Sequence, residues 1–286
     1  MPPVHGRAGR ARPPREEGPG PRDQSQPPRR PRAALAAQGV EVVAADMDDP
    51  ASLQRALAGA RRVFSVQSWQ HVGIDGEARQ GRAVAEACAE VGVAHLVYGS
   101  AGTGEAGTGV AHFEVKLGVE AHTRALGVPL TVLRPCPFME LMVADEFYPQ
   151  VGVWNGERKI VGLTRRIPWV AAHDIGEAIA NAFAAPERWI GREAVLVSDV
   201  RSLGEARELY TDGLGRAPRA WPLPLWLVQR MAGKDLLDMW HWMVAWLDGA
   251  GGAGLDTLRA RSREIIPTPT DMPAFFRAWR AAAVPS

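Results

Sequence analysis

The sequence predicts an α/β fold, in which a parallel sheet flanked by helices is followed by a smaller helical region. Two apolar, β-branched runs at 93–98 and 129–133 predict buried strands, and the amphipathic segment 111–126 between them predicts a helix. A strand, a helix and a second strand with short connections form a parallel crossover, and ligands gather at the carboxyl ends of such strands. Beyond Ser202 the pattern is helical and holds six of the ten Trp.

The first 32 residues are predicted to be a disordered tail. They hold eight Arg and nine Pro against three acidic residues, with few large apolar side chains. Such a segment cannot bury enough apolar surface to offset its chain entropy. A basic tail can touch nucleic acid, but a solvated tail is the simpler interpretation. We therefore expect three parts: the tail 1–32, a sheet domain 33–200 and a Trp-rich helical cap 201–286.

After the tail, strands and helices are expected to alternate. Val40–Ala45 is a predicted strand, and Asp49 with Pro50 marks the start of a helix that ends near Leu57. Arg62–Val66 is the next strand. The remaining expected elements are a helix 75–91 capped by Asp75, a strand 167–170, a helix 175–184 capped by Asp174, a strand 193–198, and a helix 235–248 that Gly249–Gly254 interrupts.

Composition excludes several classes of function. A net charge of +1 argues against a nucleic-acid-binding or anionic membrane surface, and no apolar run approaches the ~20 residues that span a bilayer. The N-terminus lacks the apolar region of a secretion signal. Two Cys without metal-ligand spacing indicate a reducing compartment, so we expect a cytoplasmic protein with no metal site and with Cys88 in the core.

Several motifs occur in an order and spacing that resemble one family. They are Gly73-Ile74-Asp75-Gly76-Glu77, Arg79-Gln80-Gly81, the stretch 92–100, His112-Phe113-Glu114-Val115-Lys116, and Leu133-Arg134-Pro135 followed by Phe138-Met139-Glu140. Over about 33–189 the chain resembles the NmrA-like family of atypical short-chain dehydrogenase/reductases. This resemblance implies a Rossmann-like sheet that binds NADP or NAD, with NADP favoured. It implies either an NAD(P)H-dependent oxidoreductase for a small carbonyl or quinone-like substrate, or a non-catalytic NADP(H)-sensing regulator that binds a partner protein.

Lys116 and His112 are the expected catalytic residues. They are four residues apart and so share one helical face. In typical short-chain dehydrogenases a Tyr stands four residues before a Lys that holds the nicotinamide ribose, and His112 occupies that Tyr position here. By resemblance, Lys116 contacts cofactor ribose or substrate. His112 can act as an acid or base near neutral pH, although simple packing at the helix start is an equal alternative.

The same resemblance implies a set of cofactor-binding residues at the strand ends. They are Asp46 and Met47 beside the adenine, Ser65, Val66 and Gln67 beside the ribose and pyrophosphate, Ser100 as a polar ligand of cofactor or substrate, and Pro135 and Phe138 over the nicotinamide. Asp46 is equally well explained as a strand-end turn residue, and Phe138 as a core residue.

Two further features have alternative interpretations. Gly102–Gly107 formally matches Gly-x-Gly-x-x-Gly, but it starts three residues after the strand-end Gly99, and the next strand ends in Arg134-Pro135 rather than in an acid. We expect it to be a loop beside the substrate pocket. Five C-terminal Trp either line a pocket for a flat apolar substrate or pack as core, namely Trp221, Trp226, Trp240, Trp242 and Trp246.

The chain departs from the family pattern before Ala33. The family begins with a strand, a Gly-x-x-Gly-x-x-Gly loop and a helix that hold the pyrophosphate, and residues 1–32 show none of these signals. We therefore expect weak cofactor binding and a gap in the sheet beside Val40–Ala45 and Arg62–Val66. A Pro/Arg/Gly-rich run of this length is what GC-rich coding DNA yields out of frame, so we predict a frameshift shortly before Ala33, whose product would be impaired in cofactor binding.

Overall fold

The computed structural model describes residues 29–143, 152–220 and 224–283. The chain divides into two units, Met1–Asp46 and Met47–Ser286, and each is described by itself. The predicted tail lies outside the described residues up to position 28. In the described ranges, no helix has both the length and the apolar character that crossing a membrane requires.

Among its described residues, 29–46, the first unit contains one helix, α1 (Arg29–Ala37). Four residues of the predicted tail thus belong to a helix, and Pro31 is tolerated because first-turn N–H groups have no intrahelical acceptor. The predicted strand Val40–Ala45 is wrong, because these residues follow a turn at Gly39 without regular structure. A strand needs a partner for its backbone groups, and the described residues 29–46 offer no second extended segment.

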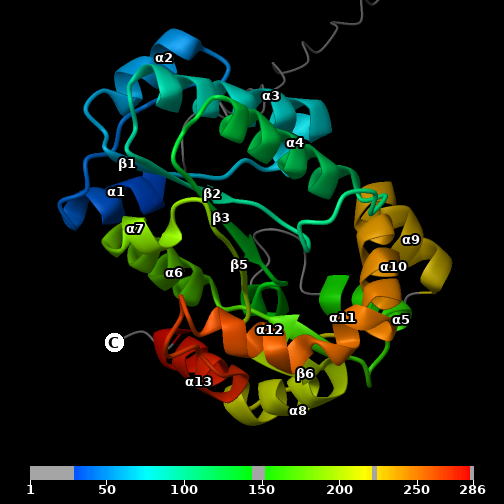
Figure 1. Cartoon of the computed structure of the whole chain (residues 1–286). Helices are drawn as coiled ribbons and strands as arrows, with labels where there is room; N and C mark the ends of the chain where they lie inside the picture. The colour runs from blue at the N-terminus through cyan, green and yellow to red at the C-terminus, as the bar shows by residue number, and fades with distance from the viewer. Residues whose placement is uncertain (1–28, 144–151, 221–223, 284–286) are drawn as a thin grey trace, which may run out of the picture. The chain divides into compact units, whose positions relative to one another are not determined.

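Four parallel strands form the main sheet of the second unit, in the order β1-β2-β3-β5 (Figure 1). They are β1 (Arg62–Ser65), β2 (His95–Gly99), β3 (Leu130–Pro135) and β5 (Glu193–Leu196). The register sets Ser65 beside Tyr98 and Gly99 beside Leu133, so the carboxyl ends of the strands are adjacent. The predicted α/β fold with its parallel crossover is confirmed. In the described part of this unit, β1 is paired on one side only.

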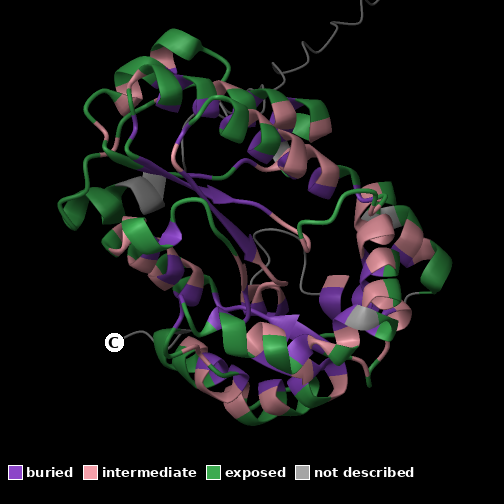
Figure 2. Cartoon of the chain, in the orientation of Figure 1, coloured by how far each residue is buried: buried purple, intermediate pink, exposed green. Residues whose placement is uncertain are grey.

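Helices cover both faces of this sheet (Figure 1), and β2 and β3 are buried along nearly their whole length (Figure 2). The helices are α2 (Pro50–Leu57), α3 (Trp69–Glu90) and α4 (Ala111–Ala125) on one face, and α6 (Ala172–Ala184) and α7 (Pro186–Trp189) on the other. Along β2, Leu96 and Tyr98 pack in the first layer and Val97 in the second. Burial on both faces explains the continuous apolar run that predicted this strand.

Core packing also confirms the interpretation of Cys88. Its side chain is fully buried in the layer between α3 and the sheet, among Val84 and Leu96. Burial raises the pKa of the Cys88 thiol to about 11, because the thiolate would lose its hydration there. Cys88 is therefore an inert core side chain.

Two predicted helix caps are wrong. Asp49 caps α2 as expected, since its carboxylate accepts a hydrogen bond from the Ala51 N–H at 3.0 Å. In contrast, α3 begins at Trp69 and is broken at Gly73, whose φ is 73°. The long helical segment resumes directly after Gly73, so Asp75 lies in its first turn and not at its cap. Helix α6 begins at Ala172, and the buried Asp174 in its first turn instead binds the distant Thr270, whose hydroxyl donates to it at 2.7 Å. The orientation of the Asp174 side chain is therefore set by its hydrogen bond to a distant segment and not by capping of its own helix.

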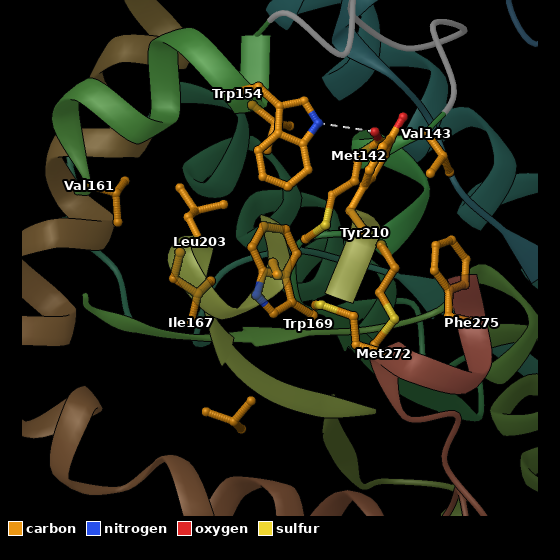
Figure 3. Close-up of a cluster of buried hydrophobic side chains, with 14 of the residues drawn as sticks. Met142, Val143, Trp154, Val161, Ile167, Trp169, Leu203, Tyr210, Met272 and Phe275 are labelled. Atoms are coloured by element: carbon orange, nitrogen blue, oxygen red, sulfur yellow. Dashed lines mark hydrogen bonds between the residues drawn. The ribbon is translucent and has the colours of Figure 1, made fainter. Parts of the chain in front are cut away.

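A second core lies around two antiparallel strands, β4 (Arg166–Trp169) and β6 (Asp199–Ser202), with α8 (Leu203–Leu214) and α13 (Met272–Ala283). The predicted strand 193–198 is too long by two residues, because β5 ends at Leu196 and the chain turns before β6, which pairs with β4. The Val197 N–H there donates to the Ser262 hydroxyl at 2.9 Å instead of to a neighbouring strand. Figure 3 shows this core, in which Trp154, Trp169 and Tyr210 are almost completely buried.

The second unit also contains the following helices. They are η1 (Met139–Met142), the π-helix η2 (Gly152–Glu157), α5 (Arg158–Ile160), α9 (Leu225–Ala232), α10 (Lys234–Asp248), α11 (Ala250–Ala253) and α12 (Leu255–Ser262). The predicted helix 235–248 is confirmed as α10. The predicted interruption at Gly249–Gly254 is only partial, because α11 forms inside it. Gly251 approaches Trp246 so closely that a Cβ there would lie 2.1 Å from its ring, so the glycines serve close packing.

Candidate functional site

A cavity of about 1230 Å³ opens at the carboxyl ends of the main-sheet strands. One wall comes from the segments that follow β1, β2 and β3, and another from η2 and α10. Its lining is mostly apolar, with a few polar side chains between. The size exceeds that of a usual small-ligand site, so it has room for a dinucleotide segment and a second small molecule together. The carboxyl edge of a parallel sheet is the position at which α/β folds bind ligands.

Lys116 lies in this wall as half of a buried ion pair. Its Nζ is 2.8 Å from the Glu77 carboxylate, and the two side chains are 8% and 0% exposed. Lys116 also donates to the backbone carbonyls of Gln67 at 3.1 Å and of Gly99 at 3.4 Å. The Glu77 contact is an ion pair without hydrogen-bond geometry, so the two carbonyls are the hydrogen-bond acceptors of the ammonium among the described residues. The charge therefore ties α4 and α3 to the carboxyl ends of β1 and β2, and contact with cofactor stays a prediction.

Glu77 belongs to one of the family motifs but is not among the predicted site residues. A signal was present, because Glu77 stands on the same face of α3 as the buried Val84 and Cys88, at helical spacing. A carboxylate on an otherwise apolar face predicts a buried cationic partner, because an unpaired buried charge is too costly. Only the tertiary structure shows that this partner is Lys116.

His112, four residues before Lys116, is paired with a carboxylate from α10. Its Nδ1 lies 2.5 Å from Oδ2 of Asp235, and both side chains are largely buried. The imidazole stacks on Trp69 with ring centroids 5.8 Å apart and meets the edge of Phe113 at 4.5 Å. These contacts fix the ring plane. The second ring nitrogen, Nε2, has no hydrogen-bond partner among the described residues, so it is available to a ligand. Asp235 was not predicted, and no local motif marks it.

Ser100 belongs to a buried charge network. Its hydroxyl donates to Glu120 at 2.6 Å and accepts from the Arg134 guanidinium at 3.0 Å. Burial would lower the pKa of Arg134, but its bonds to the carboxylates of Glu120 and Glu193 keep that pKa raised. Ser100 lines the cavity, yet its proton is already donated within the protein. A role as a ligand of cofactor or substrate stays a prediction.

The end of β1 brings three predicted cofactor residues together with Met47. The Gln67 amide nitrogen donates to the Ser65 hydroxyl at 2.8 Å and lies 3.9 Å from the Met47 sulfur. Val66 and Gln67 line the cavity, whereas Ser65 and Met47 lie behind Gln67 and outside the lining. The buried Gln67 amide oxygen has no partner among the described residues. Asp46 belongs to the first unit, so its predicted role is untested.

The segments after β2 and β3 complete the rim. Pro135 and Phe138 line the cavity, and their position over a nicotinamide stays a prediction. The glycine-rich loop contributes Thr103 and Glu105, and it packs tightly, because a Cβ on Gly104 would lie 3.0 Å from the Arg134 guanidinium. Gly104 also has φ 88°, which disfavours any other residue.

The predicted Trp cluster divides between cavity and surface. Trp240, Trp242 and Trp246 line the cavity from α10. Trp226 on α9 is 65% exposed, and Trp221 lies outside the described residues. Of the five predicted Trp, the three on α10 therefore line the cavity, and whether they bind a substrate stays a prediction.

The comparisons with known proteins agree with this architecture. The sequence matches the NmrA-like family over residues 22–276. It is 28% identical over 249 residues to FrzB of Cladobotryum sp, an NmrA-like family domain-containing oxidoreductase, which covers 77% of this chain and 73% of FrzB.

Solved structures with the same fold include a regulator and an enzyme. NmrA, a negative transcriptional regulator in complex with NAD, superimposes with a TM-score of 0.66 at 18% identity over 88% of this chain and 84% of NmrA. The NADPH-dependent quinone oxidoreductase QOR2 of Escherichia coli, in complex with NADPH, does so with a TM-score of 0.64 at 21% identity over 87% and 86%. The family match spans most of the chain, and the chain therefore belongs to the NmrA-like family.

Proposed function

We propose that the protein is an NAD(P)H-dependent oxidoreductase that reduces a small carbonyl or quinone-like compound, with NADP(H) as the favoured cofactor. The observation that carries the proposal is the His112–Asp235 pair beside the strand ends, in a cavity large enough for two ligands. The relatives FrzB and QOR2, named as oxidoreductases, support the reaction class.

The described residues can accommodate a dinucleotide at its nicotinamide end. Pro135 and Phe138 line the strand end where a nicotinamide would lie, and Val66 and Gln67 line the end of β1, where the resemblance places the ribose and pyrophosphate. The glycine-rich loop that would hold the pyrophosphate is expected before Ala33, and residues 66–68 between β1 and α3 contain no glycine. We therefore assign no glycine loop to the pyrophosphate.

The role proposed for His112 is proton donation. A reduced nicotinamide supplies a hydride when it is bound, and the carbonyl oxygen of the substrate must then gain a proton to give the alcohol or hydroquinone. His112 can deliver that proton from Nε2 while the Asp235 carboxylate accepts from Nδ1 and stabilises the imidazolium. Lys116 and Glu77 position the strand ends from which the cofactor is contacted.

NADPH oxidation with a panel of quinones and aldehydes tests the proposal. We expect turnover by the unaltered protein, and a loss of roughly 100-fold or more in kcat for His112→Asn and Asp235→Asn, the usual size of an acid–base contribution. His122→Asn is the matched control on α4, because His122 pairs with Glu86 at the surface. Asp238→Asn is the control on α10.

A second candidate is a non-catalytic NADP(H)-sensing regulator that binds a partner protein. It is favoured by the buried position of Lys116, whose charge is paired with Glu77 and which already donates hydrogen bonds to two backbone carbonyls. If NADPH binds, measured by its fluorescence, but no compound in the panel is reduced, the oxidoreductase proposal is wrong and the regulator is supported.

A further inference from the structure

Helix α12 presents one of its faces to the cavity. Gly254, Thr257, Leu258 and Arg261 line the cavity, and they follow the i, i+3, i+4, i+7 pattern of a single helical face. The face of α12 that carries Arg261 is therefore turned to the cavity. Thr257 and Arg261 are exposed, so they stand at its mouth, where a ligand reaches them from solvent.

The charge of Arg261 is not neutralised by any described acidic group. The two acidic side chains nearest to it in the sequence have other partners. Asp256 accepts from Arg166 at 2.9 Å, and Glu264 accepts from Arg192 at 3.1 Å. Since Arg261 takes part in no ion pair with the described residues, its guanidinium N–H groups are available to a ligand.

The other charged groups of the lining do not offer a free cation. Lys116 and Glu77 neutralise each other in their ion pair. Burial raises the pKa of Glu157 to about 8, so this acid is protonated and uncharged at neutral pH. Glu105, in the loop after β2, has no ion-pair partner among the described residues, and its negative charge repels an anion. Within the described lining, an anionic group of a ligand is therefore drawn to Arg261.

Arg261 stands at the end of the sheet that is remote from β1. The neighbouring Ser262 hydroxyl accepts from the Val197 N–H directly after β5 at 2.9 Å, and β5 and β1 are the two outer strands of the described sheet. The segment after α12 packs with α6 on the face opposite to α4, which carries His112, and Figure 1 shows α4 and α12 on opposite sides of the sheet. A ligand that runs from His112 to Arg261 thus extends away from β1, where the resemblance places the cofactor ribose and pyrophosphate.

The donors at this mouth fit a carboxylate. The planar guanidinium of an arginine can donate two parallel hydrogen bonds to the two oxygens of a carboxylate. The Thr257 hydroxyl lies one helical turn before Arg261 on the same face and can donate a third. The remaining lining is mostly apolar, which suits an apolar body behind an anionic end.

We infer that Arg261 is a specificity-determining residue that binds a carboxylate at the end of the substrate remote from its reducible carbonyl group. The substrate class is then a carbonyl compound with an apolar body and a terminal carboxylate. This inference deepens the proposed oxidoreductase function and rests on it for the reaction, whereas binding of the carboxylate is tested without any turnover.

The probes are 2-naphthoate and 2-naphthamide, which have the same rings and nearly the same shape and differ in charge. Equilibrium dialysis of the full-length protein at pH 7 and low salt gives both dissociation constants. We expect about fivefold tighter binding of naphthoate, the size of an exposed bidentate ion pair. Arg261→Gln should bring the two affinities to within about twofold of each other, because glutamine keeps a donor without the charge.

Arg263→Gln is the matched control. Arg263 ends the same helix, is exposed and lies outside the cavity lining, so this variant makes the same change in net charge and should keep the naphthoate preference. Added salt should weaken the preference of the unaltered protein and leave Arg261→Gln unaffected. In NADPH oxidation, Arg261→Gln should raise KM for 4-formylbenzoate and leave KM for 4-formylbenzamide unchanged.

Three results would overturn the inference. They are equal affinity for the two naphthyl probes, an undiminished preference in Arg261→Gln, and an equal loss of preference in Arg263→Gln. Weaker NADPH binding by Arg261→Gln with an intact naphthoate preference would also overturn it, because the anion at Arg261 would then be a cofactor phosphate. A naphthoate preference that depends on Arg261, without any NADPH oxidation, would refute the oxidoreductase and leave the carboxylate site standing.

Discussion

At the scale of single residues, the central feature is that the polar groups of the motif residues mainly bind other groups of the protein. Lys116, the residue that the motif singles out for cofactor contact, has its charge neutralised by Glu77 and its donors used by two backbone carbonyls. Ser100 is tied in the same way into the Glu120–Arg134 network. His112 is different, because Asp235 engages only one of its two ring nitrogens.

The Lys116–Glu77 pair allows a stability prediction. Lys116→Met leaves the fully buried Glu77 carboxylate without its partner, so we expect the free energy of unfolding to fall by about 3–5 kcal/mol. The double variant Lys116→Met/Glu77→Leu removes both charges and should recover to within ~1 kcal/mol of the unaltered protein. Urea unfolding at pH 7 measures both. A single variant as stable as the double variant would show that the pair is not coupled as the structure describes.

At the scale of elements, helix contacts depend on glycines at particular points. Gly213 in α8 packs directly on α13, and a Cβ there would lie 2.5 Å from the Cβ of Phe276. Gly118 in α4 has no such neighbour, because the nearest atom is the Arg82 guanidinium at 4.0 Å. The two glycines have the same backbone role and differ only in what faces them.

Alanine at these two positions should therefore have opposite effects. Gly118→Ala is expected to raise the free energy of unfolding by about 0.5–1 kcal/mol, because alanine loses less chain entropy in a helix. Gly213→Ala is expected to lower it by roughly 1–3 kcal/mol, because the methyl group forces α8 and α13 apart. Thermal unfolding followed by circular dichroism compares the pair, and a stabilised Gly213→Ala would contradict the close contact.

At the scale of the whole molecule, the cavity joins parts of the second unit that are far apart in the sequence. Its walls run from Gln67 after β1 to Trp246 on α10, and the buried Glu157 stands between them in the chain. A neutral acid at this position links the stability of the whole unit to pH. Its carboxyl group must be hydrated and ionised when the chain unfolds.

The sign of this pH effect follows from the two pKa values. The pKa of Glu157 is about 8 in the folded protein and 4.5 as its ordinary value, so the folded chain binds one more proton between these limits. The stabilisation is complete below pH 4.5 and is lost as pH rises through the window to 8. We expect Glu157→Gln to gain ~4 kcal/mol relative to the unaltered protein between pH 5 and pH 8.5, from 1.36 kcal/mol per pKa unit. Urea unfolding at several pH values measures this difference, and parallel stability curves would show that Glu157 is ionised when folded.

The sequence alone determined the elements whose signals are local. The apolar run of β2, the capped start of α2 at Asp49 and the periodicity of α4 each lie within a few residues, because strand and helix periods are properties of the local backbone. The ordered motifs placed Lys116 and His112 at one cavity and indicated the family. Local signals failed at Asp174, which binds Thr270 instead of capping a helix, and at Val40–Ala45, where an apolar pattern has no partner strand among the described residues of its unit.

Only the tertiary structure decided which groups meet in the site. Asp235 reaches His112 across 123 positions of the chain, and Glu77 reaches Lys116 from another helix. The Glu157 side chain is shut off from water only in the folded chain, where η2 packs against α10 at Gly156. The protonation of a carboxyl group depends on whether water reaches it, and that exclusion is a property of the folded packing. No periodicity or spacing in the sequence carries it.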